Sequence, residues 1–238
     1  MEVTMGNKIF SFALAAAIVL GVVHREDTLP IQTNTKTVAE VVLRRTVEIN
    51  AFIGGSQSIG SGVLYEKDGN VFVLTAAHVI GEGKGLYIVE QVDIDDETQI
   101  QTWTADVVAY ETDSDWAILR LVGDTRCIFG GTTFMHSSPQ VGDEVYAVGS
   151  PLGEENTISE GIVANANRTV NWNLDKHFVV TCAGTHGSSG GGVFDVKTGN
   201  CIGIVVRMNP HAKLLYIVKI KTILDDLQKI GQLSLFPT

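Results

Sequence analysis

The sequence is short of cysteine and of charge, and each shortage excludes a class of protein. Three cysteines in 238 residues are too few for a disulfide framework, and none has the spacing of a zinc site. Charged residues make up only 18% and apolar residues 45%, a balance typical of a globular chain rather than a disordered one. The net charge of −10 argues against nucleic acid or anionic lipid as a partner. We expect no metal and no cofactor, and interpret the acidic segment 93–97 as a solvated turn because it lacks a calcium loop's glycine and distal glutamate.

The cysteines leave one alternative open. Cys127, Cys182 and Cys201 are odd in number, so at least one thiol is unpaired within the chain. Cys182 and Cys201 fall on two predicted strands that flank a glycine-rich loop, so a bridge between them is conceivable. We favour the interpretation that they are small buried apolar residues.

The sequence also lacks an apolar run long enough for an ordinary membrane-spanning helix. The longest run, residues 9–23, is shorter than the roughly 20 residues that such a helix needs and resembles the apolar core of a secretory signal. We therefore expect residues 1–30 to be a signal peptide or a short membrane anchor. The rest of the protein is then exported, periplasmic or extracellular, or tethered through residues 9–23.

The remainder of the chain consists of short segments rich in β-branched and aromatic residues, separated by glycine turns. These favour an all-β fold of two six-stranded antiparallel barrels, which leave no exposed strand edge, with a short C-terminal α-helix. We assign 31–122 to the first barrel, 123–140 to a linker, and 141–238 to the second barrel and helix. The helix is predicted from apolar residues at helical spacing: Ile220, Ile223, Leu224, Leu227 and Ile230. The predicted strands are 46–52, 59–65, 71–75, 86–92, 102–110, 116–122, 144–148, 157–164, 177–182, 192–196, 201–207 and 214–218.

Two segments of the first half carry candidate catalytic side chains. His78 follows a predicted strand and is flanked by small residues that leave its imidazole accessible. Asp115 immediately precedes an apolar strand, where a carboxylate can accept a hydrogen bond from an imidazole N–H. Asp113 is the competing carboxylate, but it lies farther from the apolar run and is expected to be more solvated. Either segment alone is more often structural than catalytic.

The third segment is a glycine-rich loop around Ser189 that leads into a strand. Glycine lets successive backbone N–H groups point to one spot, where a tetrahedral oxyanion would lie. The chain order is His78, Asp115, Ser189, with the first two residues in the first half. That order is one of the convergent arrangements of a serine nucleophile, its base and an orienting acid.

With these motifs, the sequence resembles the trypsin-like serine proteases, nearest to the HtrA (DegP-like) branch. TAAHV at 75–79 matches T-x-A-H-V, DWAIL at 115–119 matches D-[LI]-A-[VL]-[LI], and GSSGGG at 187–192 resembles G-N-S-G-G-P. Segments that flank these motifs also resemble those of the family: GSGV at 60–63, AVGSPLGEENT at 147–157, NCIGI at 200–204 and YIVKI at 216–220. Ser188 and Gly192 depart from the pattern, and Gly192 can loosen the loop. The likeness covers about 38–230 and includes no PDZ domain, so chaperone-like or PDZ-regulated behaviour is not expected.

The resemblance implies a chymotrypsin-like fold and a serine endopeptidase that forms an acyl-enzyme intermediate. The resemblance also implies that the backbone amides of Gly187 and Ser189 form the oxyanion hole, with His186 in the same loop. Polypeptide substrates add as an extended strand along Val205, Val206 and Arg207. The residue at the base of the primary pocket is Ala183, so a small or aliphatic side chain is expected at the cleavage site. Two alternatives stay open: a catalytically silent scaffold of the same fold, and a serine esterase.

Overall fold

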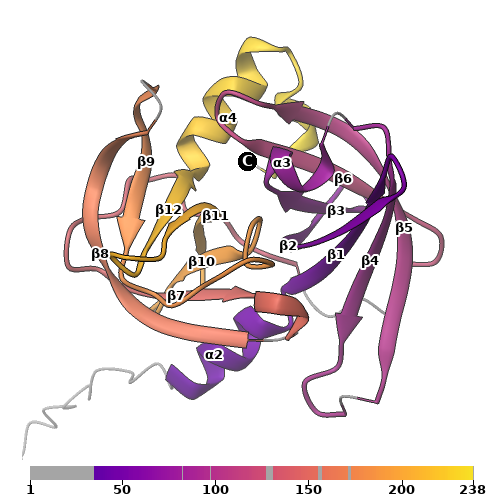
Figure 1. The fold of residues 1–238 in the computed structure, drawn as a ribbon, viewed down its shortest axis with the longest axis horizontal. Coiled ribbons are helices and arrows are strands. Elements are labelled where there is room, and N and C mark those ends of the chain that lie inside the picture. The colour runs from indigo at the N-terminus through magenta and orange to yellow at the C-terminus, as the bar shows by residue number, and fades with distance from the viewer. Residues whose placement is uncertain are drawn as a thin grey trace, which may run out of the picture. The chain divides into compact units, whose positions relative to one another are not determined.

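The computed structural model describes residues 35–237 apart from 82, 97, 127–130, 155–156 and 171–172. The described residues belong to one unit, Thr33–Thr238, in which the strands form two closed barrels of six antiparallel strands each. Helices lie around and between the barrels (Figure 1). The predicted fold class is therefore confirmed.

The first barrel contains the strands that precede His78 and follow Asp115. Its strand order is β1-β2-β3-β6-β5-β4, so β3, which leads to His78, pairs directly with β6, which follows Asp115. Valine, isoleucine and leucine on the inward faces fill the barrel, as expected for β-branched and aliphatic residues on a pleated surface. Its strands are β1 (Thr46–Ile53), β2 (Ser56–Lys67), β3 (Asn70–Thr75), β4 (Leu86–Val92), β5 (Ile100–Glu111) and β6 (Trp116–Val122).

The second barrel has the order β10-β11-β12-β9-β8-β7. Phe178, Val193 and Ile217 are fully buried within its apolar core. The loop that carries Ser189 enters the barrel through its shortest strand, β10. Its strands are β7 (Glu144–Gly149), β8 (Thr157–Val170), β9 (Asn173–Val180), β10 (Gly192–Asp195), β11 (Cys201–Asn209) and β12 (Leu214–Lys219).

In the described part of the chain, three α-helices and two short 3-10 turns accompany the barrels. The C-terminal helix α4 (Ile220–Lys229) buries Ile220, Ile223 and Leu227 on one face, as their spacing predicts. Ile230, which was expected on the same face, lies just past the end of the helix and is exposed. It continues directly from β12 and lies beside both barrels in Figure 1. The other helical segments are α2 (Thr35–Leu43), α3 (Ala77–Ile80), η1 (Pro151–Gly153) and η2 (Leu233–Leu235).

The structure differs from the sequence prediction at α2 and at the β8–β9 hairpin. No element was expected before residue 46, and the valines of α2 by themselves favour strand over helix. The helix contacts β7 and β8 and buries Val42 completely, so tertiary packing decides its conformation. Strand β8 continues to Val170 rather than ending at 164, and β9 begins at Asn173. Asparagines in this stretch disfavour strands, but pairing between β8 and β9 overrides that preference.

The two described cysteines are free, so the bridge left open by the sequence is absent. Cys182 and Cys201 belong to different apolar clusters and are both buried. Burial raises the pKa of the Cys182 thiol to about 11 and that of Cys201 to about 12. The interpretation as small buried apolar residues is confirmed.

The apolar run at 9–23 lies outside the described residues. Within the described part of the chain, no helix is long and apolar enough to cross a membrane.

Candidate active site

His78 is presented by a short helix that begins just after β3. Ala76 is extended, with φ −83° and ψ 143°, and α3 starts at the next residue. Ala77, Val79 and Ile80 pack inward, so the one turn is held by apolar contacts while the imidazole of His78 is left half exposed. The small residues noted in the sequence thus provide access to the imidazole.

Asp115 binds His78 through both of its carboxylate oxygens. Oδ1 accepts a hydrogen bond from the backbone N–H of His78 at 2.9 Å, and Oδ2 lies 2.7 Å from its Nδ1. An ionised carboxylate only accepts, so Nδ1 carries the proton and the neutral ring keeps Nε2 as its basic nitrogen. Asp113 takes no part in this pair; its backbone N–H donates to Glu111.

Ser189 faces His78 across a pocket of about 600 Å³. Both residues line it, together with Ile59, His186 and Gly187 among others. Among the described residues no hydrogen bond joins His78 to Ser189, and such bonds are often long until substrate is bound. The pocket brings together an imidazole and a hydroxyl from different barrels.

The backbone around Gly187 is turned so that two N–H groups remain available. Leu152 N–H donates to the carbonyl of His186 at 2.7 Å, which turns the His186–Gly187 peptide and directs the Gly187 N–H away from Leu152. Gly187 has φ 93°, a conformation that favours glycine. Neither Gly187 nor Ser189 donates its N–H to an acceptor in the described part of the chain. Two such donors beside a hydroxyl suit the oxygen of a tetrahedral adduct.

Ser61 of the first barrel fixes this loop, and sequence reasoning missed its role. Its N–H donates to the carbonyl of Ser189 and its Oγ donates to the carbonyl of Gly187, both at 2.7 Å. The same Oγ accepts from Ser150 N–H at 2.8 Å, and the residue is fully buried. The signal available in the sequence was that glycines flank Ser61. The structure explains one of them by tight packing, because a Cβ at Gly62 would lie 2.2 Å from the side chain of Val73. Tight packing there hinted at a structural role but not at these partners.

The residues expected to bind substrate fall into three neighbouring hollows. Ala183 and Val205 line a cavity of only about 20 Å³, which Leu215 also lines. His186 lies in the pocket shared by His78 and Ser189. Val206 and Arg207 line a hollow of about 430 Å³ on the other side of His78 and Asp115. None of the residues lining the small cavity is charged.

Within the described residues, no group of three His, Cys, Asp or Glu side chains could hold a metal ion.

Comparison with known proteins places the sequence in a family. The family model of the trypsin-like peptidase domain matches residues 60–204. A serine protease HtrA-like of Staphylococcus haemolyticus is 27% identical over 200 residues, which cover 76% of this chain and 30% of the relative. A probable periplasmic serine endoprotease DegP-like of Pseudomonas putida is 29% identical over 189 residues, which cover 75% and 37%. The chain thus spans about a third of the length of these curated relatives.

Solved structures show the same fold. The Rv3671c protease of M. tuberculosis in its active form has a TM-score of 0.67 and 20% identity, covering 82% of this chain and 84% of that one. Deg5 has a TM-score of 0.65 and 22% identity, covering 80% and 90%. The two barrels therefore have the chymotrypsin-like arrangement. Since the family model matches more than half of the sequence, the chain belongs to the trypsin-like peptidase domain family.

Proposed function

We propose that the chain is a serine endopeptidase in which Ser189 is the nucleophile, His78 the general base and Asp115 the residue that orients His78. The observation that carries this proposal is the double hydrogen bond from His78 to Asp115, on the edge of a pocket shared with Ser189. The family match and the protease relatives support the reaction type.

In the proposed reaction, Ser189 Oγ attacks the scissile carbonyl while its proton passes to His78 Nε2. The imidazolium that forms is stabilised by Asp115 and gives the proton to the leaving amine. An acyl-enzyme remains, and water repeats the sequence to release the acid. The Gly187 and Ser189 amides bind the oxyanion in both steps, where one such donor is typically worth about 10²–10³ in rate.

Substrate is proposed to bind as an extended strand along β11. The ladder between β11 and β12 shifts register between Val205 and Arg207, so Val206 has no partner in β12. A peptide can add to such a backbone by strand pairing. The cavity at Ala183 then receives the side chain before the scissile bond. Its small volume and uncharged lining favour alanine, valine or a similarly small apolar residue.

Export of the protein is proposed from the apolar run at 9–23 and from its similarity to the P. putida relative, a probable periplasmic endoprotease. The run acts either as a cleaved signal or as a retained tether. Mass spectrometry of the mature N-terminus separates the two outcomes.

The decisive experiment is fluorophosphonate labelling of the purified protein, with Ser189→Ala and His78→Ala as variants. Labelling of the wild type that is lost in both variants supports a nucleophile activated by His78. A folded wild type that takes no label would point to a silent scaffold. Profiling with a peptide library then tests the specificity, and cleavage after lysine or arginine would contradict the assignment of the small cavity.

A further inference from the structure

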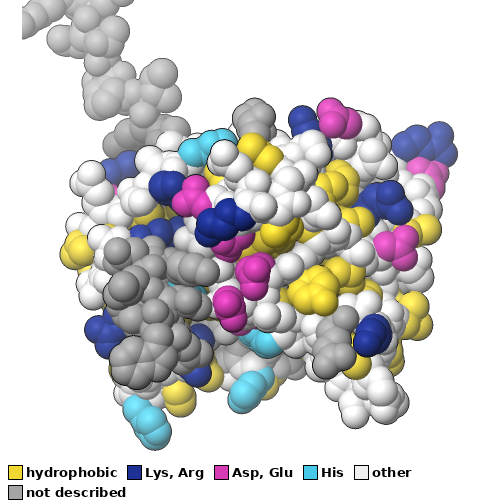
Figure 2. All heavy atoms as spheres, turned by 90° about the horizontal axis from the view of Figure 1, so that it is seen from above, with side chains coloured by type: hydrophobic (Ala, Val, Ile, Leu, Met, Phe, Trp, Pro, Cys, Tyr) yellow, Lys and Arg dark blue, Asp and Glu magenta, His cyan; other side chains and the backbone are white. Residues whose placement is uncertain are grey.

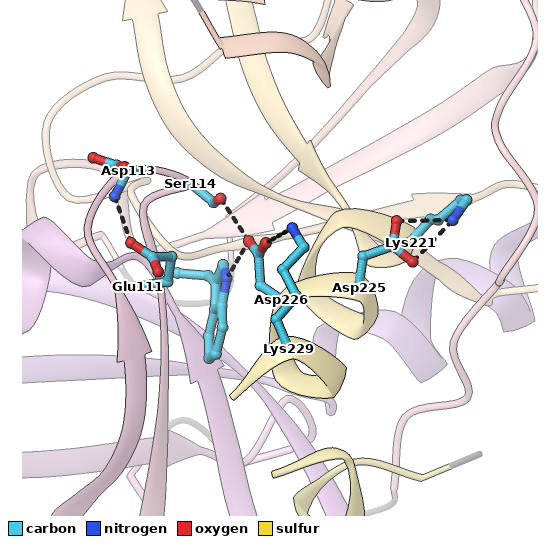
Figure 3. Close-up of polar contacts among 8 residues, drawn as sticks. Glu111, Asp113, Ser114, Lys221, Asp225, Asp226 and Lys229 are labelled. Atoms are coloured by element: carbon cyan, nitrogen blue, oxygen red, sulfur yellow. Dashed lines mark hydrogen bonds and ion pairs between the residues drawn. The ribbon is translucent and has the colours of Figure 1, made fainter. Parts of the chain in front are cut away.

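A buried carboxylate on the C-terminal helix lies against the loop that carries Asp115. Asp226 is only 6% exposed, and its Oδ2 accepts hydrogen bonds from Ser114 Oγ at 2.6 Å and Trp116 Nε1 at 3.3 Å (Figure 3). These donors are the two chain neighbours of Asp115. We propose that Asp226 is a positioning residue that holds Asp115 in its productive orientation. The inference rests on the proposed function and adds a residue to its machinery.

Asp115 has a backbone conformation that needs support. Its φ is 61°, in the left-handed region, which costs an L-residue about 1–2 kcal/mol. Aspartate tolerates this region better than most residues, but such strain persists only where the surroundings enforce it. Ser114 and Trp116 are both fully buried, so their bonds to Asp226 fix the chain immediately before and after the strained residue.

Any movement of Asp115 passes directly to His78. Both oxygens of Asp115 are occupied, one by the backbone N–H and the other by Nδ1 of His78. A single orientation of the carboxylate satisfies both bonds. If Ser114 and Trp116 lost their acceptor, the loop could relax toward an unstrained φ, and the carboxylate would turn away from the imidazole.

The charge of Asp226 is itself compensated. Its Oδ1 lies 2.9 Å from Lys229 Nζ, whose side chain is 68% exposed. The hydrogen bond to Asp226 is the main reason that the pKa of Lys229 is raised. Hydrogen bonds to a charged acceptor are shorter and stronger than neutral ones, which suits the 2.6 Å bond from Ser114. Figure 2 views the side of the molecule on which α4 lies in Figure 1, and it shows acidic and basic side chains close together there.

The position of Asp226 in the chain links the two barrels. Helix α4 follows β12 without a break, and Leu215 of β12 is one of the residues that line the small cavity beside the Ser189 loop. Asp226 therefore extends from the second barrel to the Asp115 loop of the first. The continuous segment of β12 and α4 thus lines the cavity beside the nucleophile and anchors the acid that orients its base.

The neighbouring pair on the same helix provides a matched control. Lys221 and Asp225 form an ion pair at 2.8 Å, with side chains 59% and 49% exposed and away from the Ser114 bond (Figure 3). Asp225→Ala removes a carboxylate from the same helix without touching the loop. Asp226→Asn keeps an oxygen in place for Ser114 and Trp116 while removing the charge.

The experiment compares Asp226→Ala, Asp226→Asn and Asp225→Ala in peptide hydrolysis, fluorophosphonate labelling rate and the proton spectrum of the histidine Nδ1–H. In Asp226→Ala we expect kcat to fall by about tenfold to hundredfold with KM nearly unchanged, as for a displaced catalytic group. The low-field Nδ1–H resonance of the His78–Asp115 bond should broaden or shift. Asp226→Asn should restore most of the rate and the resonance, and Asp225→Ala should match the wild type.

The outcomes separate this inference from the proposed function. If the wild type took no fluorophosphonate label, the proposed function would be contradicted. The Nδ1–H resonance would still report whether Asp226 orients Asp115. A labelled wild type with an equally fast Asp226→Ala, or a variant that loses only thermal stability, would overturn the positioning role. If Asp226→Ala does not fold, Ser114→Ala replaces it, because that change leaves Asp226 and Trp116 in place. An intermediate loss of kcat in Ser114→Ala supports the inference, and an unchanged kcat contradicts it.

Discussion

The two barrels share a strand count and a closed topology but equip the candidate site in different ways. The first barrel supplies charged and titratable side chains, His78 and Asp115, held by side-chain hydrogen bonds. The second supplies a hydroxyl and backbone amides, positioned by glycines and by backbone hydrogen bonds around Gly187. We therefore expect activity to depend on charge in the part of the site that the first barrel supplies, and on added side-chain bulk in the part that the second supplies.

At the boundary between the barrels, each part of the site is held by residues of the other part. Ser61, from the first barrel, binds two carbonyl oxygens of the Ser189 loop, and Asp226, from the helix after the second barrel, binds the Asp115 loop. Each half is therefore anchored by the other. We expect the largest loss of activity from removing charge in the first barrel, a smaller loss from adding bulk near Gly187, and a smaller one still from changing the contacts between the barrels.

The largest effect is expected from removing one charge in the first barrel. Asp115→Asn places an N–H opposite Nδ1 of His78, so the ring must carry its proton on Nε2 and can no longer accept one from Ser189. We expect a fall of about 10⁴ in kcat, with little change in folding. Hydrolysis of a peptide substrate measures it. Asp106→Asn, which removes an exposed carboxylate on β5, serves as control and should leave kcat unchanged.

In the second barrel, an added side chain should lower kcat, as removal of a charge should in the first. A Cβ at Gly187 would lie 2.3 Å from the carbonyl oxygen of Ser150, at φ 93°. Gly187→Ala must therefore move the loop, and we expect a loss of about 10²–10³ in kcat, the value of one oxyanion donor.

Gly142→Ala is the matched control for that change. Gly142 has φ 94° and nothing within 4 Å of an added Cβ, so it imposes the same backbone strain without the clash. It should cost about 1–2 kcal/mol of stability and no activity. If both glycine variants lost activity equally, the loss would come from general destabilisation, and the assignment of the amides would fail.

A smaller effect is expected at the boundary. Ser61→Ala removes the bond donated to the Gly187 carbonyl and leaves the buried Ser150 N–H without its acceptor. Leaving such a group unsatisfied costs about 1–3 kcal/mol, and part of that should appear as a lower labelling rate at Ser189. Ser56→Ala, an exposed change on the same strand, is the control. A labelling rate equal to that of the wild type would show that the two halves of the site are independent.

These boundary residues also mark where sequence reasoning stopped. The strands were predictable because β-branched and aromatic runs alternate with glycine turns, and the pairing of His78 with Asp115 was expected from the carboxylate at a strand entrance. The bonds from Ser61 to Gly187 and from Ser114 to Asp226 join residues 126 and 112 positions apart. No local periodicity encodes such contacts, and a serine between glycines or an aspartate on an amphipathic helix is ordinary in itself.

The smallest effect concerns a charge of the first barrel that lies outside the proposed machinery. Glu48 is buried; its Oε1 accepts a hydrogen bond from Asn50, whereas its Oε2 has no partner among the described residues. Burial, and secondarily the charge of Glu90, raises the pKa of Glu48 above its ordinary value. The native state then binds this proton more tightly than the unfolded chain, so stability falls as pH rises from the unfolded pKa through the folded one.

Glu48→Gln should therefore raise the free energy of unfolding at pH 7 relative to the wild type. The gain should shrink toward zero below about pH 4, where the glutamate is protonated in both states. Urea denaturation at the two pH values measures it, with the exposed Glu40→Gln as a control for net charge. A gain that is equal at both pH values would mean that packing, not charge, explains it. A loss at pH 7 would mean that the first barrel gains stability from this carboxylate, so that a charge outside the candidate site would also stabilise the fold.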